Sequence, residues 1–229
     1  MRARKKRYKD FHYTRKLHIY SRPRLKVERG LITVYARPCI KEEEIEQIID
    51  DFEVCIAEAV KKEYYLYTDK PLRYKYESYP TIVCWYHDFS EELIFRKNRF
   101  ILRLKDFKLK KIRKHYIEFL KERTYEEVTK RIEHYSKVIQ KRPKQVKIEP
   151  MMGRWAACSN LGNMKFHYKC ALLPDDIIDY VVVHELSHLI YMDHSEEYWH
   201  EVARMMPDYK KRRNWLDTKG ASIISNPVR

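Results

Sequence analysis

Residues 174–194 read PDDIIDYVVVHELSHLIYMDH, and this stretch decides the fold of the second half of the chain. It contains the pattern HExxH, in which His184 and His188 lie four residues apart. Side chains at this spacing share one face of an α-helix, so both imidazoles can bind one metal ion while Glu185 flanks the ion without binding it. The stretch therefore predicts a helix that begins near Pro174 and carries a metal site.

The other residues of this predicted helix are largely apolar, which favours the metal interpretation. Those that cover its surface are Ile177, Ile178, Val181, Val182, Leu186, Leu189 and Ile190. Buried polar groups need partners, and one shared metal ion would satisfy both histidines at once. The alternative is a buried helix whose histidines form ordinary hydrogen bonds.

A third ligand is needed, because a hydrolytic zinc site usually has three protein ligands and one open position. His194 follows the helix closely enough for a turn to bring it back to the ion. Its spacing matches the metzincin pattern HExxHxxGxxH, except that Tyr191 stands at the glycine position, which disfavours a metzincin proper. The alternative third ligands are carboxylates of the next helix, as in gluzincins: Glu196, Glu197 and Glu201. We favour His194, with Glu185 as the base that takes a proton from a zinc-bound water; three imidazoles would also accept nickel or cobalt.

Other side chains near the motif have roles that the sequence leaves open. Asp193 can accept a hydrogen bond from a ligand imidazole. Tyr191 or Tyr198 can donate a hydrogen bond to an oxyanion, and no spacing selects either of them. His200 is expected on the surface of the following helix.

Residues 164–170 alternate apolar and polar side chains, which predicts a strand shortly before the metal helix. Such a strand can line the cleft and pair with an extended substrate. The candidate substrate-binding residues are Arg154, Lys165, His167 and Lys169. They would contact an anionic ligand; the alternative for the three residues of the strand is that they simply face solvent.

Residues 150–218 carry further short motifs beside HExxH: Arg154-Trp155-Ala156-Ala157-Cys158-Ser159, Gly162-Asn163, Asp179-Tyr180-Val181-Val182-Val183, His194-Ser195, Tyr198-Trp199 and Pro207–Leu216. With these motifs in register, the chain resembles the YgjP-like metallopeptidase-domain family, which is related to SprT-like zinc proteases. The resemblance implies a zincin-like fold, a zinc ion held by His184, His188 and His194, and Glu185 as the catalytic residue. The first hundred residues match this family only loosely.

Hydrophobic periodicity outlines the rest of the chain. Residues 41–62 carry three glutamates at positions 42–44 and place their apolar side chains on one stripe, which predicts an amphipathic helix. Short strand-type segments precede this helix and return between residues 72 and 104. Residues 107–141 read as helical, and Thr124 with Glu127 fits a capping box that would start a second helix within the run.

The remaining features define the domain organisation. Residues 145–149 are expected to form a strand, and the sequence shows few linkers and no internal repeat. We therefore expect an α+β protein with a division near residue 105. Residues 1–104 would form a β-rich region with one amphipathic helix, and residues 105–229 a zincin-like metallohydrolase domain with the HExxH helix.

Composition indicates the binding partners, the cellular location and the state of the cysteines that we expect for the protein. The 229-residue chain has a net charge of +15, which attracts polyanions such as nucleic acid, although solvated lysine-rich helices give the same charge. It has neither a long apolar segment nor the apolar core of a secretory signal, so we expect a cytoplasmic protein that does not cross a membrane. Its five cysteines are scattered and lack a CxxC pattern, which predicts reduced thiols and no thiolate zinc site.

The sequence leaves three functions to compare. The first is a zinc-dependent hydrolase, most directly a peptidase. The family resemblance implies a second substrate class, nucleoside triphosphates and UTP in particular, cleaved by metal-dependent pyrophosphohydrolysis; no glycine-rich phosphate loop supports it, since the chain has only 4 glycines. The third is a nucleic-acid-binding module with a structural zinc, whose basic footprint would be residues 2–9 and 108–114.

Overall fold

The structure is a computed structural model that describes residues 6–8, 11–17, 23–28, 31–59, 64–85, 91–105 and 109–228. The chain divides into two compact units. The first contains residues 1–72 and 79–112, and the second contains residues 73–78 and 113–229. Of the basic stretches considered as a nucleic-acid footprint, residues 2–5, 9 and 108 lie outside the described residues.

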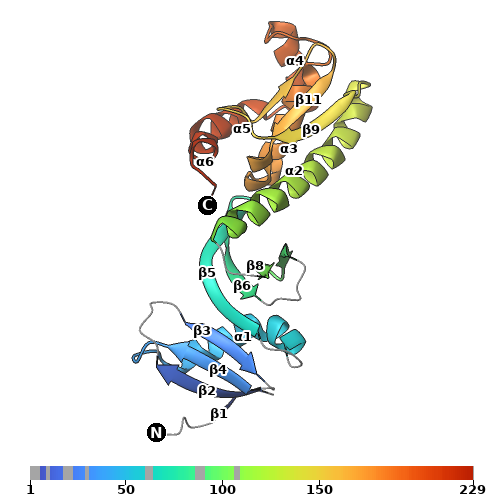
Figure 1. The fold of residues 1–229 in the computed structure, drawn as a ribbon. Coiled ribbons are helices and arrows are strands. Elements are labelled where there is room, and N and C mark those ends of the chain that lie inside the picture. Colours follow the sequence, from blue (N-terminus) through green and yellow to red (C-terminus); the bar gives the residue numbers. More distant parts are fainter. Residues whose placement is uncertain are drawn as a thin grey trace. The chain divides into compact units, whose positions relative to one another are not determined.

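A mixed eight-stranded sheet forms the framework of the first unit (Figure 1). Its strands are β1 (Lys6–Tyr8), β2 (Phe11–Leu17), β3 (Arg24–Glu28), β4 (Leu31–Ala36), β5 (Tyr64–Tyr74), β6 (Glu77–Trp85), β7 (Glu92–Arg96) and β8 (Arg99–Leu104). Their order across the sheet is β1-β2-β4-β3-β5-β6-β8-β7. The strands predicted between residues 72 and 104 are thus confirmed.

The sheet order contains one four-strand topology twice. In the first copy β4 lies between β2 and β3, parallel to β2 and antiparallel to β3. In the second copy β8 lies between β6 and β7 with the same strand directions. Helix α1 (Glu42–Ala59) follows the first copy and α2 (Leu109–Ile139) follows the second. The repeat lies in the pairing of the strands and not in their residues, so no repeat is visible in the sequence.

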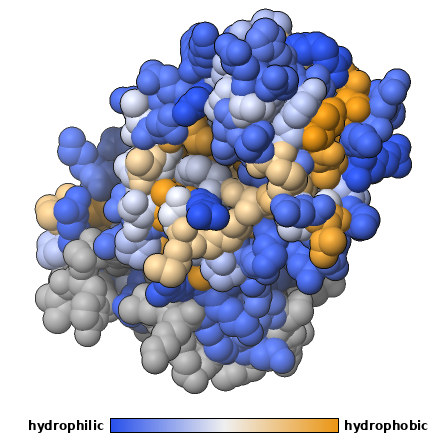
Figure 2. Space-filling model, turned by 90° about the horizontal axis from the view of Figure 1, so that it is seen from above, coloured by the Kyte–Doolittle hydropathy of each residue, from blue (hydrophilic) through white to orange (hydrophobic). Residues whose placement is uncertain are grey.

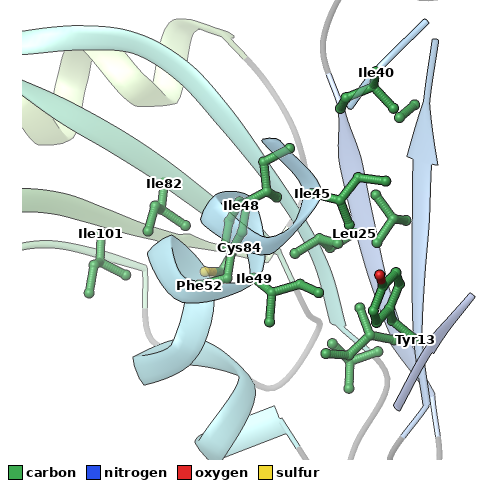
Figure 3. Close-up of a cluster of buried hydrophobic side chains, with 14 residues drawn as sticks. Tyr13, Leu25, Ile40, Ile45, Ile48, Ile49, Phe52, Ile82, Cys84 and Ile101 are labelled. Atoms are coloured by element: carbon green, nitrogen blue, oxygen red, sulfur yellow. The ribbon is translucent and has the colours of Figure 1, made fainter. Parts of the chain in front are cut away.

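Helix α1 packs its apolar stripe into the core of the first unit. Ile45, Ile49 and Phe52 are fully buried. They belong to one cluster with side chains from both copies of the topology, including Leu25 from the first and Cys84 from the second (Figure 3). The three glutamates of its first turn face the positive end of the helix dipole. The helix predicted for residues 41–62 is confirmed over Glu42–Ala59, and residues 60–62 lie outside the described residues.

Helix α2 is one unbroken helix of 31 residues. The predicted capping box at Thr124 is therefore wrong. Thr124 is fully buried, and its hydroxyl donates to the carbonyl of Tyr168 at 2.7 Å and accepts from the N–H of Ala171 at 3.1 Å. Because both of these hydrogen bonds go to another segment, the Thr124 hydroxyl does not cap a helix. It joins α2 to the segment Tyr168–Leu172.

The second unit contains a three-stranded sheet in the order β10-β11-β9. Its elements from there onward are β9 (Gln145–Glu149), β10 (Ala156–Cys158), β11 (Asn163–His167), a 3₁₀ helix (Tyr168–Leu172), α3 (Asp175–Ser187), α4 (Glu196–Met205), α5 (Tyr209–Trp215), a π-helical turn (Leu216–Gly220) and α6 (Ala221–Ser225). The strand predicted for residues 145–149 is confirmed. The strand predicted for residues 164–170 ends at His167, because the His167 imidazole caps the 3₁₀ helix by accepting from the N–H of Lys169.

Residues 73–78, at the tip of the β5–β6 hairpin, belong to the second unit. The N–H groups of Lys75 and Tyr76 donate to the carbonyls of Ala171 and Leu172 at 2.9 and 2.8 Å. These carbonyls lie directly before α3. The hairpin tip therefore helps to support α3, although it is distant in sequence.

Charged side chains strengthen the same region. The Lys75 ammonium lies 2.9 Å from Asp175, in the first turn of α3, and 3.0 Å from Glu127 on α2. Arg131, also on α2, contacts Asp175 and Asp179 at 2.8 Å each. These ion pairs fix the N-terminal half of α3 against α2.

The described part of the chain bears on two expectations, the absence of a membrane-spanning segment and the reduced state of the cysteines. None of the helices described there is long and apolar enough to cross a membrane. The cysteines described there, Cys39, Cys84, Cys158 and Cys170, are free thiols. Figure 2 shows mainly hydrophilic surface on the face viewed from above, with apolar patches between the hydrophilic side chains.

Candidate metal centre

Helix α3 forms as predicted and is buried on several faces. Its buried apolar residues are Ile177, Ile178, Tyr180, Val181, Val182, Val183 and Leu186. Two aspartates in its first turn suit the positive end of the helix dipole. The helix ends at Ser187, where the N–H groups of Ile190 and Tyr191 bond to the Ser187 carbonyl. This turn redirects the chain so that the following loop can return to the histidines.

Three imidazoles converge at the end of α3. The candidate ligand atoms of His184, His188 and His194 all lie within 4.8 Å of one another, and among the described residues they form the one cluster suited to a metal ion. The Nε2 atoms of His184 and His194 are 3.2 Å apart. Nδ1 of His188 lies 3.0 Å from the carbonyl oxygen of Tyr191. Since a carbonyl only accepts, this Nδ1 carries the proton and leaves Nε2 of His188 with a lone pair for a metal ion.

Aromatic side chains of α4 hold these imidazoles in place. The Tyr198 hydroxyl donates to the His184 carbonyl at 3.0 Å, and the Tyr198 ring stacks on His188 with 4.7 Å between centroids. Trp199 stacks on His194 at 5.5 Å. Burial raises the pKa of Tyr198 and keeps its hydroxyl a donor. Tyr191 and Tyr198 are the two tyrosines considered as donors to an oxyanion. The Tyr198 hydroxyl instead donates to the backbone of His184.

The imidazoles are held in the form that binds metal. Burial, followed by the charges that His188 and His194 would carry, lowers the pKa of His184 to about 3. Burial also lowers the pKa of His194. Both are therefore neutral near pH 7, and a neutral imidazole has the lone pair that a metal needs. Together with a ligand atom of His188, their nitrogens match the donor set of a zinc site with one open position.

Glu185 lies beside the three histidines and outside the ligand cluster. It is buried, and its Oε2 atom has no hydrogen-bond partner among the described residues. Burial raises the pKa of Glu185 to about 8. A divalent cation nearby would favour the ionised carboxylate and oppose this shift. Glu185 is therefore placed to exchange a proton with a molecule next to the histidines.

Two cavities adjoin the histidines. The first has a volume of about 470 Å³ and is lined in part by Arg154, Trp155, Tyr180, Trp199, Arg213 and Asp217. The second has a volume of about 360 Å³ and is lined in part by Ala157, Cys158 and Met192. His184, Glu185 and His194 line both. The candidate metal centre is thus accessible from two cavities.

The strand beside this space is β10, and it has a free edge. Ala156 lines both cavities. β10 pairs with β11 on one side and stands at the end of the sheet, so no other described strand bonds to its outer edge. The expectation that the strand within residues 164–170 pairs with substrate is wrong, because β11 lies between β10 and β9 and uses both of its edges.

The four candidate substrate-binding residues lie in different surroundings. Arg154 lines both cavities. Lys165 is exposed and its ammonium lies 2.7 Å from Glu149. His167 and Lys169 are buried. Of the four, Arg154 alone is next to the histidines.

Lys169 has a structural role in place of the expected contact with an anionic ligand. Its ammonium donates to the carbonyls of Ile223, Ile224 and Asn226 at 3.3, 2.6 and 2.7 Å. An ammonium has three donors, and these carbonyls use all of them. The side chain therefore anchors the C-terminal end of α6, where a cation also suits the helix dipole.

The other residues considered as ligands or their partners lie apart from the cluster. The carboxylates that do not join it are Glu196, Glu197 and Glu201. The Tyr191 carbonyl, and not Asp193, accepts from the His188 imidazole. His200 is exposed, as predicted.

His167 is expected to make the protein less stable in acid. Burial, followed by the nearby Lys169 charge, lowers the pKa of His167 to about 4, whereas an unfolded histidine has a pKa near 6.5. Between these values the unfolded state binds more protons, so stability falls as the pH drops from about 6.5 to 4. His167→Asn keeps an acceptor for the Lys169 N–H but does not titrate. When the pH falls from 7 to 5, the free energy of unfolding should therefore decrease less for this variant than for the wild type. The difference should be up to about 2 kcal/mol.

Thermal melting of both proteins at pH 7 and pH 5, in chelator so that metal binding does not contribute, measures this difference. Equal losses of stability in the two proteins would show that His167 is not the titrating group.

The chain matches one known protein family over most of its length. The model of a family described as YgjP-like, metallopeptidase domain, matches residues 21–219. Among solved structures, the chain is similar to the metallopeptidase zymogen abylysin of Pyrococcus abyssi, with 26% identity over 40% of this chain and 93% of that chain and a TM-score of 0.38. A search of curated proteins finds no significant match. Since the family model covers most of the sequence, the chain belongs to the YgjP-like metallopeptidase-domain family.

Proposed function

We propose that this protein is a zinc-dependent peptidase in which His184, His188 and His194 hold the metal and Glu185 is the catalytic base. One observation carries the proposal: three imidazoles converge beside a buried, uncoordinated carboxylate that lines two cavities. Membership of a metallopeptidase family supports a metal-dependent hydrolase in general. The HExxH spacing and the all-imidazole donor set support zinc in particular.

Each residue has a distinct part in the proposed reaction. When bound, zinc would supply a Lewis acid that activates water and polarises the scissile carbonyl. Glu185 accepts a proton from the attacking water and passes it to the leaving amine. Tyr198 holds His184 and His188 in position through its hydroxyl and its ring.

The free edge of β10 supports a peptide as the substrate. An extended peptide can add to an unpaired strand edge through backbone hydrogen bonds, with its side chains directed alternately to either face. Ala156 has a small side chain and lines both cavities. A peptide held along β10 would thus place one of its bonds next to Glu185.

Nucleoside triphosphate hydrolysis remains the alternative, and the same assays separate it from peptidase activity. Purified protein should contain about one zinc ion per chain, hydrolyse a denatured protein, and lose activity in chelator with recovery on adding zinc. Faster hydrolysis of UTP, with no cleavage of denatured protein or of a peptide library, would refute the peptidase proposal.

Loss of the third histidine tests the ligand set. His194→Ala should weaken zinc binding by at least about 100-fold, since changes even to the partners of ligands weaken binding by about 10- to 100-fold. His200→Ala is the matched control, because His200 lies six residues further on and is exposed. Zinc affinity is measured by competition with a chromogenic chelator. Equal affinities of the two variants would exclude His194 as a ligand.

A further inference from the structure

We infer that Arg154 and Arg213 form a carboxylate-binding subsite beside the metal centre, so that the enzyme prefers peptides with a carboxylate near the scissile bond. The inference rests on the proposed peptidase function and names its substrate class. The carboxylate can come from an aspartate or glutamate side chain or from the C-terminus of a short peptide.

The two arginines come from different elements and meet in one cavity. Arg154 directly precedes Trp155 and β10, and Arg213 lies on α5. Both line the cavity of about 470 Å³ that also contains His184, Glu185 and His194. A carboxylate bound between the guanidinium groups would therefore lie within a residue or two of the peptide bond placed next to Glu185.

Arg154 has its charge available for a ligand. Its side chain is exposed, and no ion pair or hydrogen bond joins its guanidinium to any residue in the described part of the chain. Many other arginines of this unit are paired, as Arg131 is with Asp179 and Arg204 is with Glu201. An unpaired arginine beside a catalytic carboxylate is a natural partner for a substrate anion, because guanidinium groups bind carboxylates through two parallel hydrogen bonds.

Arg213 is held in position without being neutralised. Its guanidinium carbon lies 4.6 Å from the centroid of the Trp199 ring, and Trp199 itself stacks with His194 and with Tyr209. The nearest carboxylate, Asp217, is 3.7 Å away, and both side chains of this pair are more than half exposed. Such an exposed pair is weak, so Arg213 can exchange Asp217 for a buried substrate carboxylate at little cost.

The walls of the cavity strengthen the expected attraction. Trp155, Tyr180 and Leu216 line it beside the arginines, and apolar walls lower the local dielectric constant and strengthen charge pairing. Arg213 does not line the second cavity, where Ala157 and Met192 are exposed to a ligand instead. The first cavity is therefore the one that both arginines line, so the preference for a carboxylate should apply to the part of the substrate that occupies it, on one side of the scissile bond.

The test compares isosteric peptides. A quenched fluorescent peptide that the wild type cleaves is varied at each of the three positions on either side of the cleaved bond, with glutamate against glutamine. The wild type should show at least about a tenfold higher kcat/KM for glutamate at one position on one side. A second pair, with a free or an amidated C-terminus, shows whether a terminal carboxylate serves as well as a side chain.

Variants assign the preference to the two arginines. Arg154→Gln and Arg213→Gln should each reduce the ratio of kcat/KM for the glutamate peptide to kcat/KM for the glutamine peptide. In the double variant this ratio should be close to one. Arg213→Glu should favour a lysine peptide. The matched control is Arg204→Gln, which removes one positive charge from an exposed ion pair on α4 outside both cavities, and its ratio should equal that of the wild type.

Binding to the zinc-loaded Glu185→Gln variant separates the subsite from the chemistry. This variant should bind the glutamate peptide at least about tenfold more tightly than the glutamine peptide, as measured by fluorescence anisotropy. Equal binding and equal cleavage of the two peptides would overturn the carboxylate subsite while leaving the peptidase intact. A binding preference without any cleavage by the wild type would instead uphold the subsite and refute the peptidase.

Discussion

Glu185→Gln is expected to lower kcat for peptide hydrolysis by at least about 100-fold while zinc content and folding stay unchanged. General acid–base catalysis by a positioned side chain contributes about 100- to 10,000-fold, and the amide of glutamine cannot accept a proton at neutral pH. Glu185 is not in the ligand cluster, so zinc affinity should be retained. The substitution also removes a buried ionisable group with an unpartnered Oε2, so the melting temperature should not fall.

The matched control for this prediction is Glu197→Gln. Glu197 is an exposed glutamate in the first turn of α4, and its replacement removes the same charge without touching the cavities. Activity, zinc content and thermal stability are measured on all three proteins. If Glu185→Gln retained wild-type turnover with zinc bound, a different group would have to activate the water.

The candidate metal centre could be located from the sequence because its geometry is local. The four-residue spacing of His184 and His188 has a fixed meaning on a helix, and the apolar residues around them marked that helix as buried. His194 follows after one short turn, so its return to the same point needed no knowledge of the rest of the fold. The approach of His194 Nε2 to within 3.2 Å of His184 Nε2 agrees with this prediction.

The substrate side of the site could not be read in the same way, because it depends on contacts between distant segments. Alternation in residues 164–170 predicted a strand, but alternation does not tell a central strand from an edge strand, and the free edge belongs to β10. Arg213 was not selected because its neighbours in sequence are also basic, and its place in the first cavity follows only from the packing of α5. The alternation placed Lys169 either against an anionic ligand or in solvent, whereas backbone carbonyls of the C-terminal segment surround its ammonium.

Helix α2 illustrates a similar limit of local patterns. A threonine three residues before a glutamate fits a capping box, and both residues are present at 124 and 127. The Thr124 hydroxyl instead bonds to the 3₁₀ helix, and Glu127 pairs with Lys75 of the hairpin tip. Thr124 and Glu127 therefore bind partners that are distant in sequence, and α2 continues through both residues without a break.

A fragment that begins at residue 105 is expected to fail to fold into a cooperative, zinc-binding unit. It lacks residues 73–78, which belong to the second unit. Without them the carbonyls before α3 lose the Lys75 and Tyr76 donors, and the Tyr116 hydroxyl loses both its bonds to the backbone of Arg73. Four hydrogen bonds at about 1 kcal/mol each, with the Lys75 ion pairs in addition, amount to a large part of the roughly 5 to 15 kcal/mol that stabilises a typical domain.

Lys75→Met in the full chain isolates the charged part of this support. Hydrogen bonds from Lys75 and from Arg131 offset the effect of burial and hold the pKa of Asp175 below its ordinary value, so removing the ammonium should destabilise the second unit. The loss should be about 1 to 2 kcal/mol at pH 7 and should shrink as Asp175 and Glu127 become protonated in acid.

The matched fragment is 64–229, which retains the β5–β6 hairpin. Its Ile82, Cys84 and Ile101 pack in the cluster that contains α1, so they are replaced by threonine to keep the fragment soluble. This fragment should show a cooperative thermal transition and bind zinc as the full chain does, whereas 105–229 should do neither. If 105–229 melted cooperatively and bound zinc with full affinity, the hairpin tip would be dispensable, and residue 105 would mark a true domain boundary in spite of the contacts that cross it.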